Sequence, residues 1–152
     1  MPAEIGAPTP DFTLRNYDRT TLSRSDLLGS SALVVFIPFA FTRTCTAELC
    51  DLRDNLGTLQ QGGSKVVVIT CDSMGTNRAW AESEGVTYPV LSDFWPHGEV
   101  STAYGCFNEK LGVPNRTTYV LDADGIVRDI IESESFGTAR DVGSYTRALA
   151  SL

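Results

Sequence analysis

The stretch from Ala32 to Cys50 reads ALVVFIPFAFTRTCTAELC and joins two kinds of secondary structure. Residues 32–37 form a continuous apolar run rich in β-branched side chains, which is the pattern of a strand buried on both faces. A helix is predicted over residues 46–59, because leucines recur there at spacings of three and four residues. The segment therefore predicts a strand, a loop and a helix, with Cys45 at or just inside the start of the helix.

The chain on either side continues this alternation of strands and helices. Residues 65–70 (KVVVIT) predict a second buried strand, and residues 73–84 predict a helix that Gly85 ends. Residues 11–14 and 21–22 are expected to pair as a hairpin. The other predicted elements are a short strand over 88–91, a short helix over 98–104, two strands over 117–121 and 126–131 joined by an Asp-Gly turn, and a closing helix over 142–152.

Buried strands separated by helices predict an α/β fold with a mixed central β-sheet flanked by helices. The middle strands are expected to be parallel and the terminal hairpin antiparallel. This order of elements is that of the thioredoxin-like fold with an N-terminal β-hairpin extension. A length of 152 residues fits one domain, so we expect residues 1–152 to form a single domain.

Composition and charge disfavour several classes of partner. The net charge of −7 and the pI near 4.6 disfavour binding to nucleic acid or to an anionic membrane surface. No apolar run reaches the ~18 residues of a membrane span, and the N-terminus lacks the features of a secretory signal. We therefore expect a cytoplasmic protein, in which thiols are kept reduced. Its four cysteines then predict buried apolar residues or reactive thiols.

Cys45 is the residue with the strongest chemical signal. The free N–H groups and the dipole of the helix N-terminus, together with Arg43, favour the thiolate, which is the reactive form of cysteine. Thr42 is placed to hydrogen-bond the sulfur or a bound oxygen, and Pro38 stiffens the loop and shields the sulfur from water. The plainer alternative is that Cys45 is a small buried residue beside a helix start.

The spacing Pro38-x-x-x-Thr42-x-x-Cys45 resembles the motif of the peroxiredoxins. Residues 92–98 (SDFWPHG) and 103–105 (AYG) are similar to the AhpE-like subgroup, and the likeness runs from about residue 5 to residue 149. It implies a thiol-dependent peroxidase that reduces hydrogen peroxide and organic hydroperoxides through a Cys45 thiolate and sulfenic acid. The implied partners are a thiol reductant (thioredoxin, a glutaredoxin-like protein or a low-molecular-weight thiol) and a second copy of the chain. No metal and no organic cofactor are implied.

The same resemblance implies roles for individual residues. Thr42 hydrogen-bonds the peroxide, and Arg116 stabilises the thiolate and the charge that develops on the leaving oxygen. Glu48 holds Arg116 or Arg43 in position, and Pro38 shapes the pocket. Without the resemblance, Arg116 reads as a solvated charge beside a strand, and Glu48 as an acid that the helix dipole favours in the first turn.

Cys50 lies five residues after Cys45 on the predicted helix. Peroxiredoxins of the Q type (bacterioferritin comigratory proteins) carry a resolving cysteine at that offset. Five helical residues advance ~7.5 Å and place the two Cα atoms roughly 8–9 Å apart, whereas a disulfide needs about 4.4–6.8 Å. A Cys45–Cys50 disulfide therefore requires the first turns of the helix to unwind. The alternative, a one-cysteine enzyme in which Cys50 packs among the leucines, stays open.

The remaining candidates have weaker signals. Cys71 is expected to be structural, and Cys106 to lie on a surface turn, with an intermolecular or mixed disulfide as the alternative role. His97 is expected to be structural or part of an interface. Residues 94–96 (Phe-Trp-Pro) form either simple loop packing or the surface of a homodimer, since aromatic residues are enriched in interfaces.

Three other functions compete with the peroxidase. A redox sensor or relay would pass the oxidation of Cys45 to a partner protein, and turnover with a small reductant would separate it from an enzyme. A thiol-disulfide oxidoreductase usually has a Cys-x-x-Cys pair, which this chain lacks. A zinc site is disfavoured because Cys45 and Cys50 have the wrong spacing for paired ligands and no histidine partners.

Overall fold

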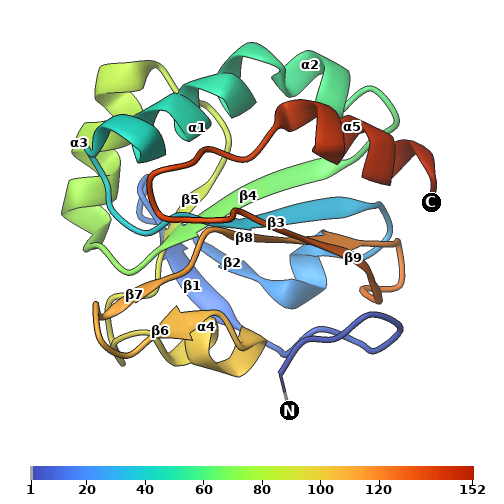
Figure 1. Ribbon diagram of the computed structural model, residues 1–152, viewed down its shortest axis with the longest axis horizontal. Coiled ribbons are helices and arrows are strands. Elements are labelled where there is room, and N and C mark those ends of the chain that lie inside the picture. Colours follow the sequence, from blue (N-terminus) through green and yellow to red (C-terminus); the bar gives the residue numbers. More distant parts are fainter. Residues whose placement is uncertain (1) are drawn as a thin grey trace.

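A mixed β-sheet forms the centre of the computed structural model, which describes residues 2–152 (Figure 1). The main sheet has seven strands in the order β2-β1-β5-β4-β3-β8-β9, and β6 and β7 form a separate pair. The strands are β1 (Thr13–Asn16), β2 (Thr21–Ser23), β3 (Ala32–Phe36), β4 (Lys65–Thr70), β5 (Val90–Ser92), β6 (Phe107–Asn108), β7 (Val113–Pro114), β8 (Thr117–Leu121) and β9 (Val127–Glu132). The helices are the 3₁₀ turn η1 (Arg24–Leu27), α1 (Arg43–Asp54), α2 (Leu56–Leu59), α3 (Met74–Glu84), α4 (Glu99–Tyr104) and α5 (Val142–Ala150).

The strand directions confirm the predicted mixed sheet. Strands β3, β4 and β5 are parallel to one another. Strand β8 runs antiparallel to β3, and β9 antiparallel to β8. The N-terminal hairpin of β1 and β2 joins the sheet through an antiparallel pairing of β1 with β5.

The continuous apolar run of β3 is explained by cover on both faces of the sheet. Leu33 and Val35 belong to the core cluster beneath α1, α3 and α5, whereas Val34 and Phe36 belong to the cluster on the opposite face. Figure 1 shows α1, α2, α3 and α5 on one side of the sheet and α4 with the N-terminal segment on the other. A strand between two layers has no polar face, so it cannot alternate apolar and polar residues.

The helix after β3 differs from the prediction of a single helix over residues 46–59. It begins three residues earlier, at Arg43, and is interrupted at Asn55, whose φ of −110° and ψ of 10° are not helical. The Asn55 side chain donates a hydrogen bond to the carbonyl of Asp51 (2.8 Å). An asparagine that satisfies a terminal carbonyl in this way offers the backbone an alternative to helix continuation. The leucines that recur at three- and four-residue spacing continue into α2 after the break, and we call this series the leucine stripe.

Helix α3 follows its prediction closely. The Ser73 hydroxyl oxygen accepts a hydrogen bond from the backbone N–H of Thr76, and Gly85 ends the helix with a left-handed φ of 66°. Trp80 and Ala81 are fully buried on its inner face.

The prediction that Cys106 lies on a surface turn is wrong. Gly105 ends α4 with a φ of 88°, and the chain folds back so that the Cys106 N–H donates to the Ser101 carbonyl (3.0 Å). The Cys106 side chain is only 2% exposed and packs with Tyr104 and Tyr119. It is therefore not available for a disulfide with another molecule. Cys71 is buried, as expected for a structural residue.

Within residues 2–152, no helix combines the length and the apolar character needed to cross a membrane.

Candidate active site

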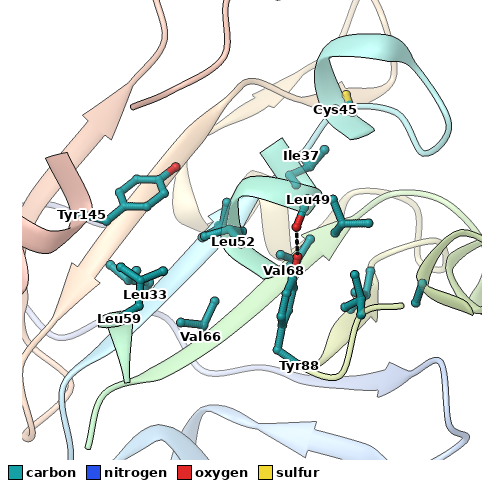
Figure 2. Close-up of a cluster of buried hydrophobic side chains, with 14 of the residues drawn as sticks. Leu33, Ile37, Cys45, Leu49, Leu52, Leu59, Val66, Val68, Tyr88 and Tyr145 are labelled. Atoms are coloured by element: carbon teal, nitrogen blue, oxygen red, sulfur yellow. Dashed lines mark hydrogen bonds between the residues drawn. The ribbon is translucent and has the colours of Figure 1, made fainter. Parts of the chain in front are cut away.

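Cys45 lies in the first turn of α1, immediately after the loop that leaves β3. Its side chain is fully buried, at the α1 end of the core cluster above Ile37 (Figure 2). Its sulfur accepts hydrogen bonds from the backbone N–H of Phe39 (3.4 Å) and from Nη2 of Arg116 (3.2 Å). Both donors favour a negatively charged sulfur over a neutral one.

The loop between β3 and α1 is folded so that the Phe39 amide points at the sulfur. Pro38 is buried at its start, and Phe41 adopts a left-handed φ of 68°, which is unfavourable for a residue with a Cβ atom. The backbone N–H of Ala40 donates to Oδ2 of Asp72 (2.8 Å), which ties the loop to the end of β4. Burial raises the pKa of Asp72, and the Ala40 hydrogen bond opposes that effect.

Thr42 occupies the N-cap position of α1 and is exposed. Its hydroxyl donates to the carbonyl of Phe39 (3.2 Å) and makes no hydrogen bond to the Cys45 sulfur in this structure of residues 2–152. Its oxygen retains lone pairs that can accept a hydrogen bond from a bound molecule. Arg43, which is also exposed, does not contact Glu48 in this part of the chain.

Arg116 reaches Cys45 because of the sheet register. It immediately precedes β8, whose first residue, Thr117, pairs with Phe36 at the end of β3. The guanidinium is buried and fixed on three sides. Nη2 donates to Cys45, Nε to the Phe136 carbonyl (2.7 Å) and Nη1 to Oε1 of Glu48 (2.5 Å). The reading of Arg116 as a solvated charge is therefore wrong.

Arg140 is a residue of this site that the sequence did not indicate. It lies just before α5, is 5% exposed, and contacts both oxygens of the Glu48 carboxylate. Its backbone N–H and Nε donate to Oε2 of Glu48 (2.9 and 2.8 Å), and Nη2 donates to Oε1 (3.0 Å). Further hydrogen bonds run to the Phe36 carbonyl (2.9 Å) and the Thr118 hydroxyl (3.0 Å). The single available signal was a cation placed before a helix N-terminus, where the dipole disfavours it.

The charges of this buried group do not balance when Cys45 is neutral. Burial raises the pKa of Glu48, but the hydrogen bonds and charge of Arg140, together with the charge of Arg116, outweigh burial and lower that pKa overall. The site then holds two cations and one carboxylate. Because an unpaired buried charge is costly, a negative charge that develops beside Arg116 is stabilised there.

Cys50 lies on α1 but points toward α3. Its Sγ–H donates to Oε2 of Glu84 (3.2 Å), and the side chain is half-buried. Burial, followed by the hydrogen bond and charge of Glu84, raises the pKa of this thiol. The structure therefore does not bring Cys50 to Cys45, and all four cysteines are free thiols.

His97 and the cavities add little to the chemistry. Both ring nitrogens of His97 lie near backbone carbonyls, Nδ1 at 3.1 Å from Phe94 and Nε2 at 2.7 Å from Gly112, which fits a structural role. A hollow of about 240 Å³ is lined by Arg116 but not by Cys45.

Comparison with known proteins identifies the family. The sequence profile described as "AhpC/TSA family" matches residues 5–130. The chain belongs to the AhpC/TSA family. Arg140 lies outside the matched residues.

Individual relatives of this AhpC/TSA chain agree with the resemblance drawn from the Pro38–Cys45 motif. Alkyl hydroperoxide reductase E of Mycobacterium tuberculosis is 44% identical over 149 residues, which cover 97% of each chain. The chloroplastic peroxiredoxin Q of Populus jackii is 31% identical over 148 residues, 97% of this chain and 68% of that one. The crystal structure of peroxidoxin BcpB from Mycobacterium tuberculosis superposes with a TM-score of 0.87 at 29% identity, covering 99% of this chain and 98% of that one. The peroxiredoxin resemblance and the thioredoxin-like fold are thereby confirmed.

Proposed function

We propose that this AhpC/TSA protein is a thiol-dependent peroxidase that reduces hydrogen peroxide and organic hydroperoxides with Cys45. The observation that carries the proposal is the buried sulfur, which accepts a hydrogen bond from Arg116 in a site with an excess of positive charge. The names of the relatives, an alkyl hydroperoxide reductase and a peroxiredoxin, support turnover of peroxide and do not favour a sensor or relay.

In the first step, the Cys45 thiolate attacks the terminal oxygen of the hydroperoxide. A sulfur–oxygen bond forms as the oxygen–oxygen bond breaks, which leaves Cys45 as a sulfenic acid and the other oxygen as an alkoxide or hydroxide. That oxygen takes up a proton and departs as an alcohol or water. Arg116 stabilises both the thiolate and the charge on the leaving oxygen, and Thr42 orients the peroxide.

Glu48 and Arg140 act in this scheme as positioning residues. Glu48 holds Nη1 of Arg116, and Arg140 holds Glu48 through both carboxylate oxygens. Pro38 stiffens the start of the loop that carries the Phe39 amide. The scheme needs no metal and no organic cofactor.

In the second step, Cys50 resolves the sulfenic acid. The Cys50 sulfur attacks the Cys45 sulfur, a disulfide forms, and the hydroxyl of the sulfenic acid leaves with the Cys50 proton as water. Helix α1 unwinds first, because an intact helix keeps the two Cα atoms about 8–9 Å apart. A thiol reductant then supplies two thiols, becomes a disulfide itself and restores Cys45 and Cys50. This reductant is thioredoxin, a glutaredoxin-like protein or a low-molecular-weight thiol.

The protein acts as a homodimer in the cytoplasm. Trp95 is 83% exposed and Phe94 is 50% exposed, and adjacent exposed aromatic side chains are typical of an interface. Four cysteines present as thiols suit a compartment that keeps thiols reduced.

The direct test replaces Cys45 and a matched buried cysteine in turn. Peroxide consumption with an excess of a small dithiol is followed for the wild type, Cys45→Ser and Cys71→Ser. We expect Cys45→Ser to fall to the uncatalysed rate, whereas Cys71→Ser, whose thiol lies outside the site, turns over. Activity retained in Cys45→Ser would refute the proposal.

A further inference from the structure

The environment of Cys50 contains a carboxylate that the peroxidase scheme does not use. Glu84 is the last residue of α3, and its Oε2 accepts the Sγ–H hydrogen bond of Cys50 on α1 (3.2 Å). A carboxylate at a helix C-terminus is disfavoured by the helix dipole, so helix formation does not explain this residue. Its contacts across the α1–α3 interface account for it better.

A second residue of α1 fixes Glu84 in place. Nη1 of Arg53 donates to the backbone carbonyl of Glu84 (2.6 Å) and lies 3.9 Å from its Oε2. Arg53 follows Cys50 by three residues, so the two side chains leave the same face of α1. The turn of α1 that carries Cys50 therefore contacts the end of α3 through two side chains, those of Cys50 and Arg53.

A third contact holds the same turn of α1 from below. The Tyr88 hydroxyl donates to the backbone carbonyl of Leu49 (2.7 Å), and both residues are buried (Figure 2). Unwinding α1 far enough to bring Cys50 to Cys45 must move this turn. Of these three contacts, the one between Glu84 and Cys50 involves the sulfur that would attack Cys45.

We propose that Glu84 is a positioning residue that holds the Cys50 thiol on α3 and so sets the rate at which Cys50 resolves the Cys45 sulfenic acid. The inference rests on the resolving role proposed for Cys50. While the contact lasts, Cys50 keeps its proton and points away from Cys45. The Cys45 sulfenic acid consequently persists longer and meets a second peroxide or a partner thiol more often.

The charges around Cys50 agree with this restraint. Burial raises the pKa of the thiol, and Glu84 raises it further through its hydrogen bond and charge, with a smaller contribution from Asp54. Arg53 acts in the opposite direction, and the Tyr88 hydroxyl is the other titratable group nearby. Glu84 therefore makes Cys50 a weaker nucleophile in addition to restraining it.

The test measures both steps of oxidation separately in Glu84→Ala and in the control Glu82→Ala. Glu82 lies on the same helix and is paired with Arg78 on the surface, away from Cys50. Reduced protein is mixed with one equivalent of hydrogen peroxide and quenched with acid at intervals. The intact mass of each sample is then measured by mass spectrometry. Gain of one oxygen reports the sulfenic acid, and the later loss of water from that species reports the disulfide.

We expect Glu84→Ala to form the disulfide roughly five- to tenfold faster, which is the factor given by loss of one hydrogen bond. The gain of oxygen at Cys45 stays unchanged in both variants, and Glu82→Ala forms the disulfide at the wild-type rate. An unchanged or lower rate of disulfide formation in Glu84→Ala would overturn the restraint while leaving Cys50 as the resolving residue. A sulfenic acid that persists in all three proteins would overturn the resolving role, and the restraint with it.

A second readout separates the restraint from a loss of stability. In a Cys45→Ser background, Cys50 is the thiol left with exposed surface, because Cys71 and Cys106 are buried. Its alkylation by iodoacetamide is measured against pH, with and without Glu84→Ala, and Glu84→Gln is included because it keeps an acceptor oxygen without the charge. We expect the midpoint of the alkylation profile to fall in both Glu84 variants. A midpoint that stays in place would contradict the contact.

Discussion

At the scale of single residues, the site depends on one carboxylate shared by two arginines. Glu48 accepts hydrogen bonds from Arg116 and Arg140, and all three side chains are almost fully buried. Because a buried charge without its partner is costly, each member holds the others in place. The orientation of Arg116 toward Cys45 therefore depends on Arg140, which does not itself contact the sulfur.

This dependence predicts that Arg140→Lys is not a conservative change. A lysine keeps the charge but lacks the planar set of donors that reaches Glu48, Thr118 and Phe36, so we expect a loss of about 2–3 kcal/mol in the free energy of unfolding. Peroxide reduction should slow by about tenfold as Arg116 loses its fixed orientation. The matched control is Arg128→Lys, whose exposed pair with Asp122 contributes no more than about 1 kcal/mol. Equal losses in the two variants, measured by urea unfolding, would contradict this account.

The lowered pKa of Glu48 predicts a dependence of stability on pH. A carboxyl group with a lower pKa in the folded state than in the unfolded state stabilises the fold above the unfolded value, and this contribution is lost as pH falls. The difference in free energy of unfolding between wild type and Glu48→Gln should be full at pH 7. It should shrink as pH falls below the ordinary value of 4.5 toward the lower folded value. A difference that grew on acidification would have the wrong sign.

The residues of the site differ in how far the sequence could predict them. Pro38, Thr42, Cys45 and Glu48 lie within one short segment, where local spacing and the helix N-terminus place them. Arg140 and Glu48 are 92 positions apart, and no local pattern links them. Their contact follows from the packing of α5 against the sheet, which brings the start of α5 to the first turns of α1.

At the scale of elements, α1 has to be both stable and able to open. Its inner face is buried by Leu49 and Leu52, and Tyr88 fixes the Leu49 carbonyl. Formation of the Cys45–Cys50 disulfide is incompatible with this helix, because the bond cannot span the distance between its residues.

Oxidation should therefore reduce helix content. We predict that one equivalent of hydrogen peroxide weakens the far-UV circular dichroism of the wild type and that a dithiol restores it. Cys50→Ser, which can form a sulfenic acid but not the disulfide, should keep its signal. The same loss of signal in Cys50→Ser would show that opening of α1 does not depend on the disulfide.

The elements themselves were largely predictable, because hydrophobic periodicity marks buried strands and one-sided helices. The break after α1 was not, since the leucine stripe continues through Leu56 and Leu59. At the break the Asn55 side chain donates a hydrogen bond to a backbone carbonyl, and the hydrophobic pattern gives no sign of this contact. The burial of Cys106 was missed for a similar reason, because the direction of the chain after Gly105 depends on packing against Tyr119.

At the scale of the whole molecule, the exposed aromatic residues after β5 predict self-association. If Phe94 and Trp95 form the interface of a homodimer, Trp95→Glu places a charge within it and should produce a monomer. The control is Leu152→Glu, an exposed apolar residue at the C-terminus. The oligomeric state of the wild type and of both variants is measured by light scattering across micromolar protein concentrations. A monomeric wild type, or a dimer that survives Trp95→Glu, would refute this interface.

The chemistry of the whole cycle is tested most directly by the mass of the protein after a single oxidation. Reduced wild type and Cys50→Ser are each treated with one equivalent of hydrogen peroxide, and their intact masses are measured by mass spectrometry. We expect the wild type to lose two hydrogens, as Cys45 and Cys50 form a disulfide, and Cys50→Ser to gain one oxygen. Gain of oxygen in both would contradict the resolving role of Cys50, and no rapid change in either would contradict peroxide reduction by Cys45.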